Sequence, residues 1–134
     1  LHDALPIYCI MKLTNQTLLN SISKLRVLSQ KQLPVKVSYA IAKNISKIEK
    51  ELTIYEIERQ KLIDKYAEKD NEGKVVADNN GQIKFKDKEG WEKDIKELLD
   101  IENEIDIHKF KIEELEGYNM TPAELMSIEY MIEE

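Results

Sequence analysis

The sequence has few of the residues that build disulfide-linked or metal-binding proteins. Its 134 residues include one cysteine, two histidines, four glycines and three prolines, and aromatic residues make up 7%. The lone Cys9 excludes an internal disulfide and a zinc site built on several thiolates. No apolar run reaches the roughly 20 residues of a membrane-spanning helix, so we expect no membrane partner. What remains is rich in Glu, Lys, Ile and Leu, which is typical of long amphipathic helices.

Motifs that identify an enzyme are also missing. We find no phosphate-binding glycine loop, no nucleophile elbow and no paired Cys/His set. Glu104 and His108 are four residues apart, whereas the di-iron motif needs a spacing of three. The segment from Glu68 to Gly73 is similar to the start of a calcium loop, but position twelve would be Asn79 instead of glutamate. We therefore expect no catalytic residue, no cofactor and no metal, and we expect that the protein is not an enzyme.

Charge is divided along the chain. Residues 11–50 carry eight basic residues and one acid, whereas residues 51–134 carry 24 acids and 12 bases. A basic segment joined to an acidic one indicates either an anionic partner or assembly with further copies of the chain. The first ten residues share none of the later pattern, and Met11 is a natural start. We interpret residues 1–10 as a leader that is foreign to the protein, and residues 11–134 as one helical domain.

Hydrophobic spacing predicts two helices in the basic part of the chain. Thr14 or Asn15 caps the first, which ends before Pro34 because the residue preceding proline avoids the α region. The second runs from about Val35 to about Lys69. Its apolar stripe alternates steps of four and three, as in helices that pack along a partner helix. The stripe consists of Ile41, Ile45, Ile48, Leu52, Tyr55, Arg59, Leu62 and Tyr66.

The acidic part predicts two more helices and a hairpin. One helix runs from about Lys88 to Glu116, and a short one follows the capping box that begins at Thr121. Asn80-Gly81 between β-rich runs predicts a β-hairpin insertion at about residues 73–86. We detect no internal repeat. The expected fold is mainly α: a long antiparallel α-hairpin with a small β-hairpin at its tip, plus short N- and C-terminal helices.

Lysines gather on the second helix, on the face opposite its apolar stripe. Lys36, Lys43 and Lys47 lie there, flanked by Tyr39 and Asn44. Such a face is often only solvated, but no acid interrupts this one. Lysines and a helix N-terminus attract phosphate, and tyrosine can stack on a base. The face therefore predicts a site for a compact anionic ligand.

Three further features bear on partners. Arg59 interrupts the apolar stripe, where it either pairs with Glu102 or holds an anion; we include it among the ligand-binding candidates. The acidic third helix would return beside the lysines, which disfavours duplex nucleic acid as a partner. Ile54 and Ile57 lie on the lysine side of the helix, where exposed apolar residues predict a homo-oligomer, most simply a two-fold dimer.

We interpret His108 as a core histidine.

Three segments carry a resemblance to a known family: Leu33–Asn44, Arg59–Tyr66 and Met120–Leu125. They resemble a family of small uncharacterised proteins encoded by tailed phages and prophages of Gram-positive bacteria. The resemblance covers residues 11–134 and carries no established catalytic residue. It implies a phage protein that is made in the cytoplasm of the bacterial host.

The sequence supports two non-enzymatic functions. The first is a homo-oligomeric counter-defence protein that binds and sequesters a compact anionic ligand, such as a nucleotide immune signal. Its expected ligand-binding residues are Lys36, Tyr39, Lys43, Asn44, Lys47 and Arg59. The alternative is a protein–protein interaction module that inhibits a host defence protein or assists phage assembly through its acidic helix.

Overall fold

The structure of the protein is a computed structural model that describes residues 8–133. Positions 1–7 and 134 lie outside the described residues, and with them most of the leader expected at residues 1–10. The last part of that leader, from Tyr8, opens the first strand. Among the described residues, no helix is both long enough and apolar enough to cross a bilayer.

The described chain forms two compact units. The first unit consists of residues 1–52 together with residues 102–134, and the second consists of residues 53–101. Helix α2, Val35–Tyr66, contributes its N-terminal part to the first unit and its C-terminal part to the second. The hairpin region expected at about residues 73–86 therefore belongs to a unit that also contains helices on both sides of it.

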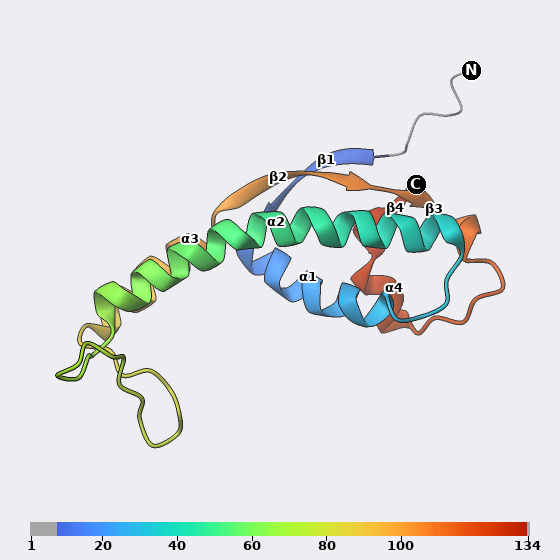
Figure 1. Cartoon of the computed structure of the whole chain (residues 1–134). Helices are drawn as coiled ribbons and strands as arrows, with labels where there is room; N and C mark the ends of the chain where they lie inside the picture. Colours follow the sequence, from blue (N-terminus) through green and yellow to red (C-terminus); the bar gives the residue numbers. More distant parts are fainter. Residues whose placement is uncertain (1–7, 134) are drawn as a thin grey trace. The chain divides into compact units, whose positions relative to one another are not determined.

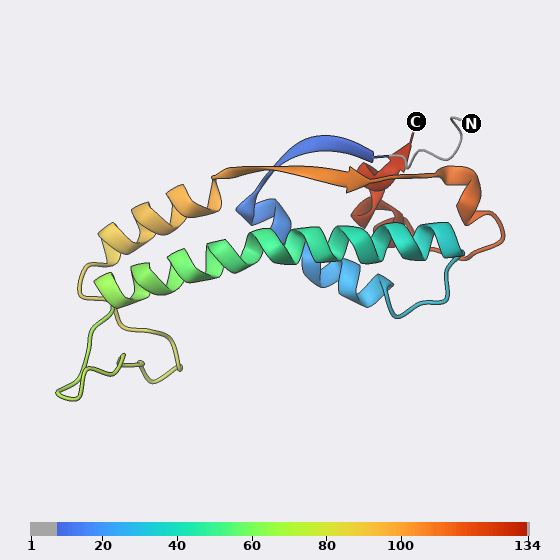
Figure 2. The ribbon, with the colours of Figure 1, turned by 45° about the horizontal axis from the view of Figure 1, so that its top comes forward.

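The first unit combines helices with a two-stranded ribbon (Figures 1 and 2). Strand β1 pairs with β2 in antiparallel register, from Tyr8 opposite His108 to Thr14 opposite Glu102, and β3 pairs with β4 in parallel. The elements besides α2 are β1 Tyr8–Thr14, α1 Asn15–Leu28, β2 Glu102–His108, β3 Phe110–Lys111, η2 Ile112–Leu115, α4 Pro122–Ser127, η3 Glu129–Met131 and β4 Ile132–Glu133. Helices η2 and η3 are single 3-10 turns.

The prediction of the third helix is confirmed over its first three turns and is wrong after them. Helix α3 spans only Lys88–Leu99, and the chain then enters strand β2. In that strand Ile105 and Ile107 are buried whereas the acids beside them are exposed, which is the two-residue period of a half-buried strand. Ile105 also continues the helical spacing that runs from Ile101 to His108, and this spacing led to the helix prediction. Ile107, two residues after Ile105, fits only the strand. The fold is mainly α, as expected, but the long antiparallel α-hairpin is not confirmed over its full length, because α3 ends at Leu99.

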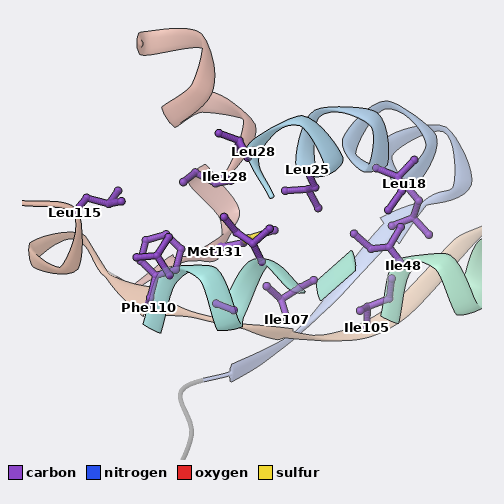
Figure 3. Close-up of a cluster of buried hydrophobic side chains, with 14 residues drawn as sticks. Leu18, Leu25, Leu28, Ile48, Ile105, Ile107, Phe110, Leu115, Ile128 and Met131 are labelled. Atoms are coloured by element: carbon purple, nitrogen blue, oxygen red, sulfur yellow. The ribbon is translucent and has the colours of Figure 1, made fainter. Parts of the chain in front are cut away.

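The core of the first unit lies where α1, α2, the β1–β2 ribbon and the C-terminal segment meet (Figure 3). Leu18, Leu25 and Leu28 of α1 point into it at the predicted helical spacing. From the C-terminal segment, Ile128 and Met131 are both 0% exposed. Because the C-terminal segment supplies fully buried side chains, it is an integral part of this core and not an appendage.

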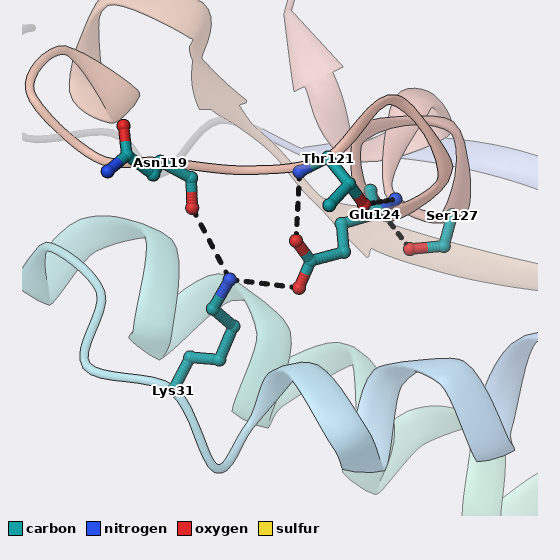
Figure 4. A network of polar contacts seen from close by, with 5 residues as sticks. All are labelled: Lys31, Asn119, Thr121, Glu124 and Ser127. Carbon is teal, nitrogen blue, oxygen red and sulfur yellow. Dashed lines mark hydrogen bonds and ion pairs between the residues drawn. The ribbon is translucent and has the colours of Figure 1, made fainter.

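Local capping signals are confirmed in the first unit. The Thr14 hydroxyl accepts a hydrogen bond from the Thr17 N–H at 3.1 Å and so caps α1. Thr121 and Glu124 form the predicted capping box, with reciprocal bonds of 3.1 and 2.9 Å. Lys31, just after α1, donates to the Glu124 carboxylate at 2.9 Å and to the Asn119 carbonyl at 3.3 Å (Figure 4). The start of α4 is therefore bonded to the end of α1.

In the second unit, the C-terminal part of α2 and helix α3 lie side by side (Figures 1 and 2). The Tyr66 hydroxyl donates to the Asp94 carboxylate at 2.6 Å and joins the two helices. Ile63 and Ala67 on one side and Leu98 on the other are buried. This antiparallel pair is the part of the predicted α-hairpin that the second unit contains.

Two nearly identical turns connect these helices, and their repetition was not predicted from the sequence. They begin at Asp70 and Asp78, and each aspartate accepts hydrogen bonds from the N–H groups two and four residues further on, at 2.8 to 3.0 Å. Gly73 and Gly81 complete them at φ +81° and +79°, a left-handed conformation that favours glycine. The predicted Asn-Gly turn is thus confirmed, but it has a second copy eight residues earlier.

The strand-like segments around these turns form a closed ring. Glu68 N–H donates to the Lys84 carbonyl, Val76 N–H to the Glu68 carbonyl and Lys84 N–H to the Val76 carbonyl, at 2.8, 2.9 and 3.0 Å. The pairing consists of isolated bridges and not of the two regular strands expected from the sequence. Each bridge is therefore supported by the other two.

Candidate functional site

The predicted lysine face of α2 adjoins the end of strand β2. Lys36, Tyr39 and Lys43 are exposed on α2, and His108 is the last residue of β2. The Tyr39 ring centroid lies 5.5 Å from that of His108, and the Lys43 Nζ lies 5.6 Å from the Tyr39 ring centroid. These four residues and Lys47 are referred to below as the basic–aromatic surface.

The lysines of this surface differ in how strongly their ammonium groups already interact with other residues of the protein. Lys47 Nζ donates to the Asp106 carbonyl at 2.7 Å, which fixes it against β2. Lys36 Nζ is 3.6 Å from the Glu114 carboxylate, and because its side chain is 77% exposed this pair is weak. Within the described chain Lys43 has no ion pair, and its ammonium lies over the Tyr39 ring. Lys43 is therefore the charge best placed to meet a ligand.

Asn44 is not part of this surface. It is 0% exposed, and its side chain is used twice by the backbone of His108. The Asn44 amide donates to the His108 carbonyl at 2.9 Å, and its oxygen accepts from the His108 N–H at 2.8 Å. The sequence interpretation of Asn44 as a ligand contact needs correction, because position 44 lies between Ile41 and Ile48 on the buried stripe.

Arg59 belongs to the second unit, whereas the other candidates belong to the first. Its guanidinium donates to the Glu56 carboxylate at 3.0 Å, one turn earlier on α2. This partner is local and differs from the Glu102 that the sequence suggested. Arg59 therefore pairs with Glu56 and is not part of the basic–aromatic surface.

His108 is the member of the surface that sequence reasoning missed. Burial lowers the pKa of its imidazole below the usual 6.5, and the positive charges of Lys47 and Lys43 lower the pKa further. The ring is therefore neutral at pH 7 and can donate one hydrogen bond and accept another. Only the β1–β2 register reveals this position, because a helix through residue 108 would have directed the ring elsewhere.

The electrostatic part of this arrangement can be tested by replacing Lys43 with methionine. The change should raise the pKa of His108, which an NMR titration of the imidazole signals would measure. Lys50→Met, on the same helix, is the matched control and should leave the pKa of His108 unchanged. Because the folded pKa lies below the unfolded one, folding stability should fall as the pH drops below about 6.5. A wild-type pKa at or above that value would contradict the arrangement.

Comparison with known proteins places the chain in a family. No curated protein and no solved structure matches it. The model of DUF1617, described as a protein of unknown function, matches residues 11–131, which is most of the chain and both units. The chain belongs to the DUF1617 family.

Proposed function

We propose that this protein is a non-enzymatic binding protein that takes up a compact anionic ligand at the basic–aromatic surface. The observation that carries the proposal is Lys43, whose ammonium has no ion pair in the described chain and lies beside the exposed ring of Tyr39. The neutral imidazole of His108 adds a hydrogen-bonding group next to the same ring. A cation, an aromatic face and a hydrogen-bonding ring together suit a nucleotide-like molecule.

Each group has a distinct part in this proposal. Lys43 and Lys36 meet the phosphates, with Lys36 exchanging its weak pair with Glu114 for the ligand. Tyr39 stacks on the planar portion, and it is 46% exposed and thus reachable. His108 donates a hydrogen bond, and a bound phosphate would raise the pKa of its imidazole by opposing the lysine charges. Asn44 holds His108 in place from behind, through the backbone.

The finer part of the proposal concerns biological context. The chain's resemblance to tailed-phage and prophage proteins supports a phage origin and action in the cytoplasm of a bacterial host. In that setting a nucleotide-derived immune signal is the compact anion whose sequestration would counter host defence. Ile54 and Ile57 of α2 are 60% and 53% exposed, which supports a homo-oligomer.

A second candidate function is a protein-interaction module that inhibits a host defence protein or assists phage assembly. It is favoured by a groove of about 260 Å³ in the first unit, floored by apolar side chains. Ile112 and Tyr118 of this groove are 47% and 46% exposed. The groove is lined by Ile112, Leu115, Glu116, Tyr118, Met120 and Leu125. An apolar side chain of a protein partner would fit it.

Calorimetric titration with cyclic di-AMP, cyclic GMP-AMP and ADP-ribose tests the leading proposal. We expect micromolar binding of at least one of them, weakened by about tenfold or more in Lys43→Glu, because a hydrogen bond to a charged group is worth about 1.5–3 kcal/mol. Lys50→Glu makes the same charge change further along α2 and should bind as the wild type does. If none of the three binds, the proposal is wrong. A protein partner lost in Tyr118→Ala but retained in Lys43→Glu would establish the second function.

A further inference from the structure

We propose that the second unit carries a separate binding site for a neutral carbohydrate. The site is a groove of about 720 Å³ beside the two turns. Phe85 and Trp91 line it and are stacked on each other, with ring centroids 4.6 Å apart and planes inclined by 18°. Because the two rings are stacked nearly parallel, each covers one face of the other, and the pair presents the remaining flat apolar ring surface at the groove wall as a platform for a ligand.

The platform is held in place by the chain around it. Phe85 is bridged to Ala67, which is fully buried and directly follows the last residue of α2. Trp91 lies in the first turn of α3, where Asp87 caps the helix by accepting from the Gly90 N–H at 3.0 Å. A Cβ on Gly90 would lie 2.6 Å from a Tyr66 ring carbon, so glycine allows Tyr66 to pack directly against this turn. The position of Trp91 is therefore fixed before any ligand arrives, which lowers the ordering cost of binding.

The rim of the groove offers unused hydrogen-bonding groups. The side chains of Glu68, Gln82 and Lys84 line it, and none of the three makes a hydrogen bond or an ion pair with the described chain. Lys88 also lines the groove, and among the described residues its only ion pair is a long contact of 3.9 Å with Glu92. Carboxylate, amide and ammonium groups together can both donate and accept.

Charge distinguishes among the ligands that could use such a platform. The lining contains two acids, Glu68 and Asp78, and two bases, Lys84 and Lys88, so its formal charge cancels. The bases of single-stranded nucleic acid also stack on aromatic rings. Proteins that bind single strands, however, line the groove along the phosphate backbone with net positive charge. A sugar ring has an apolar C–H face that packs on an aromatic ring and a periphery of neutral hydroxyls. A neutral oligosaccharide is thus the ligand class that matches both the platform and the rim.

The chain provides its own reporter for this site, because Trp91 is its only tryptophan. We expect the fluorescence of Trp91 to change saturably when the full chain is titrated with cellohexaose, maltohexaose or chitohexaose. Gln82→Ala removes a rim amide without touching the ring pair and should weaken binding by about tenfold. Phe85→Ala should weaken it further, and its fold can be checked by far-ultraviolet circular dichroism. Lys43→Glu serves as a control that should leave the titration unchanged, since its site is in the first unit.

The remaining outcomes overturn the proposal. Absence of a saturable change with all three sugars would show that the groove does not take neutral carbohydrate. A stronger response to an oligothymidine hexamer, abolished by added salt, would make it a nucleic-acid site. A sugar response that Gln82→Ala and Phe85→Ala both leave intact would place the binding elsewhere. None of these results depends on whether the basic–aromatic surface binds nucleotides.

Discussion

Replacement of Met131 by alanine should lower the free energy of unfolding by about 2–5 kcal/mol, the range for truncating a buried methionine. Met131 is 0% exposed, and it belongs to the same buried cluster as Leu28, Phe110 and Ile128. Removing its thioether chain exchanges buried apolar contacts for a cavity that a close-packed core cannot fully close. Urea unfolding followed by circular dichroism measures the change. Trp91 fluorescence is unsuitable as the only probe, because Trp91 is in the second unit.

The chain contains a matched control for this substitution. Met126 lies on α4, five residues earlier, and is 72% exposed. Met126→Ala removes the same atoms from solvent-facing surface and should change the unfolding free energy by no more than about 0.5 kcal/mol. Equal losses for the two variants would mean that the C-terminal segment does not insert into the core. That result would also contradict the placement of Ile128.

Asn44→Ala is expected to have the second large effect, about 2–4 kcal/mol of unfolding free energy. The Asn44 amide satisfies both the N–H and the carbonyl of His108, and Asn44 is 0% exposed. Alanine would leave two backbone groups without a partner in a partly buried setting, at about 1–3 kcal/mol each before relaxation. Urea unfolding measures the loss. Because the two bonds also position His108, the variant should bind the proposed nucleotide-like ligand less tightly.

Hydrogen exchange separates this effect from a general loss of packing. In Asn44→Ala the amide of His108 should exchange faster than other β2 amides, because its acceptor has been removed. Ser46→Ala, an exposed position two residues further along α2, is the control and should alter neither stability nor exchange. Unchanged exchange at His108 in Asn44→Ala would show that the bond is absent in solution.

Features set by nearby residues could be predicted from the sequence. Thr14 begins α1, Pro34 follows its end and precedes α2, and Thr121 with Glu124 builds the capping box, as predicted. In each case the signal and the structure that it specifies lie within a few residues of one another. Such local chemistry gives the same result whatever the rest of the chain does.

Strand β2 could not be predicted because its partner is distant. Glu104 is paired with Lys12, more than ninety residues earlier, in a segment that showed no pattern of its own. Ile105 fits a helix as well as a strand, whereas Ile107 fits only the strand. Two alternating positions are too short a signal to outweigh the helical spacing unless the partner strand β1 is known. The helix prediction for this segment also prevented a correct prediction of the candidate site. With residue 108 assigned to a helix, neither the place of His108 beside Tyr39 nor its bonds to Asn44 could be predicted.

The closed ring of backbone bonds in the second unit restricts how this part of the chain can vary in evolution. Glu68, Val76 and Lys84 each donate once and accept once, so a residue inserted between any two of them shifts two of the three bonds. The turn tips, Asn71-Glu72 and Asn79-Asn80, lie outside the ring and form no part of it. Related chains should therefore keep the eight-residue spacing while changing the residues at the tips. A related chain that is longer in this region should be longer by one whole additional turn.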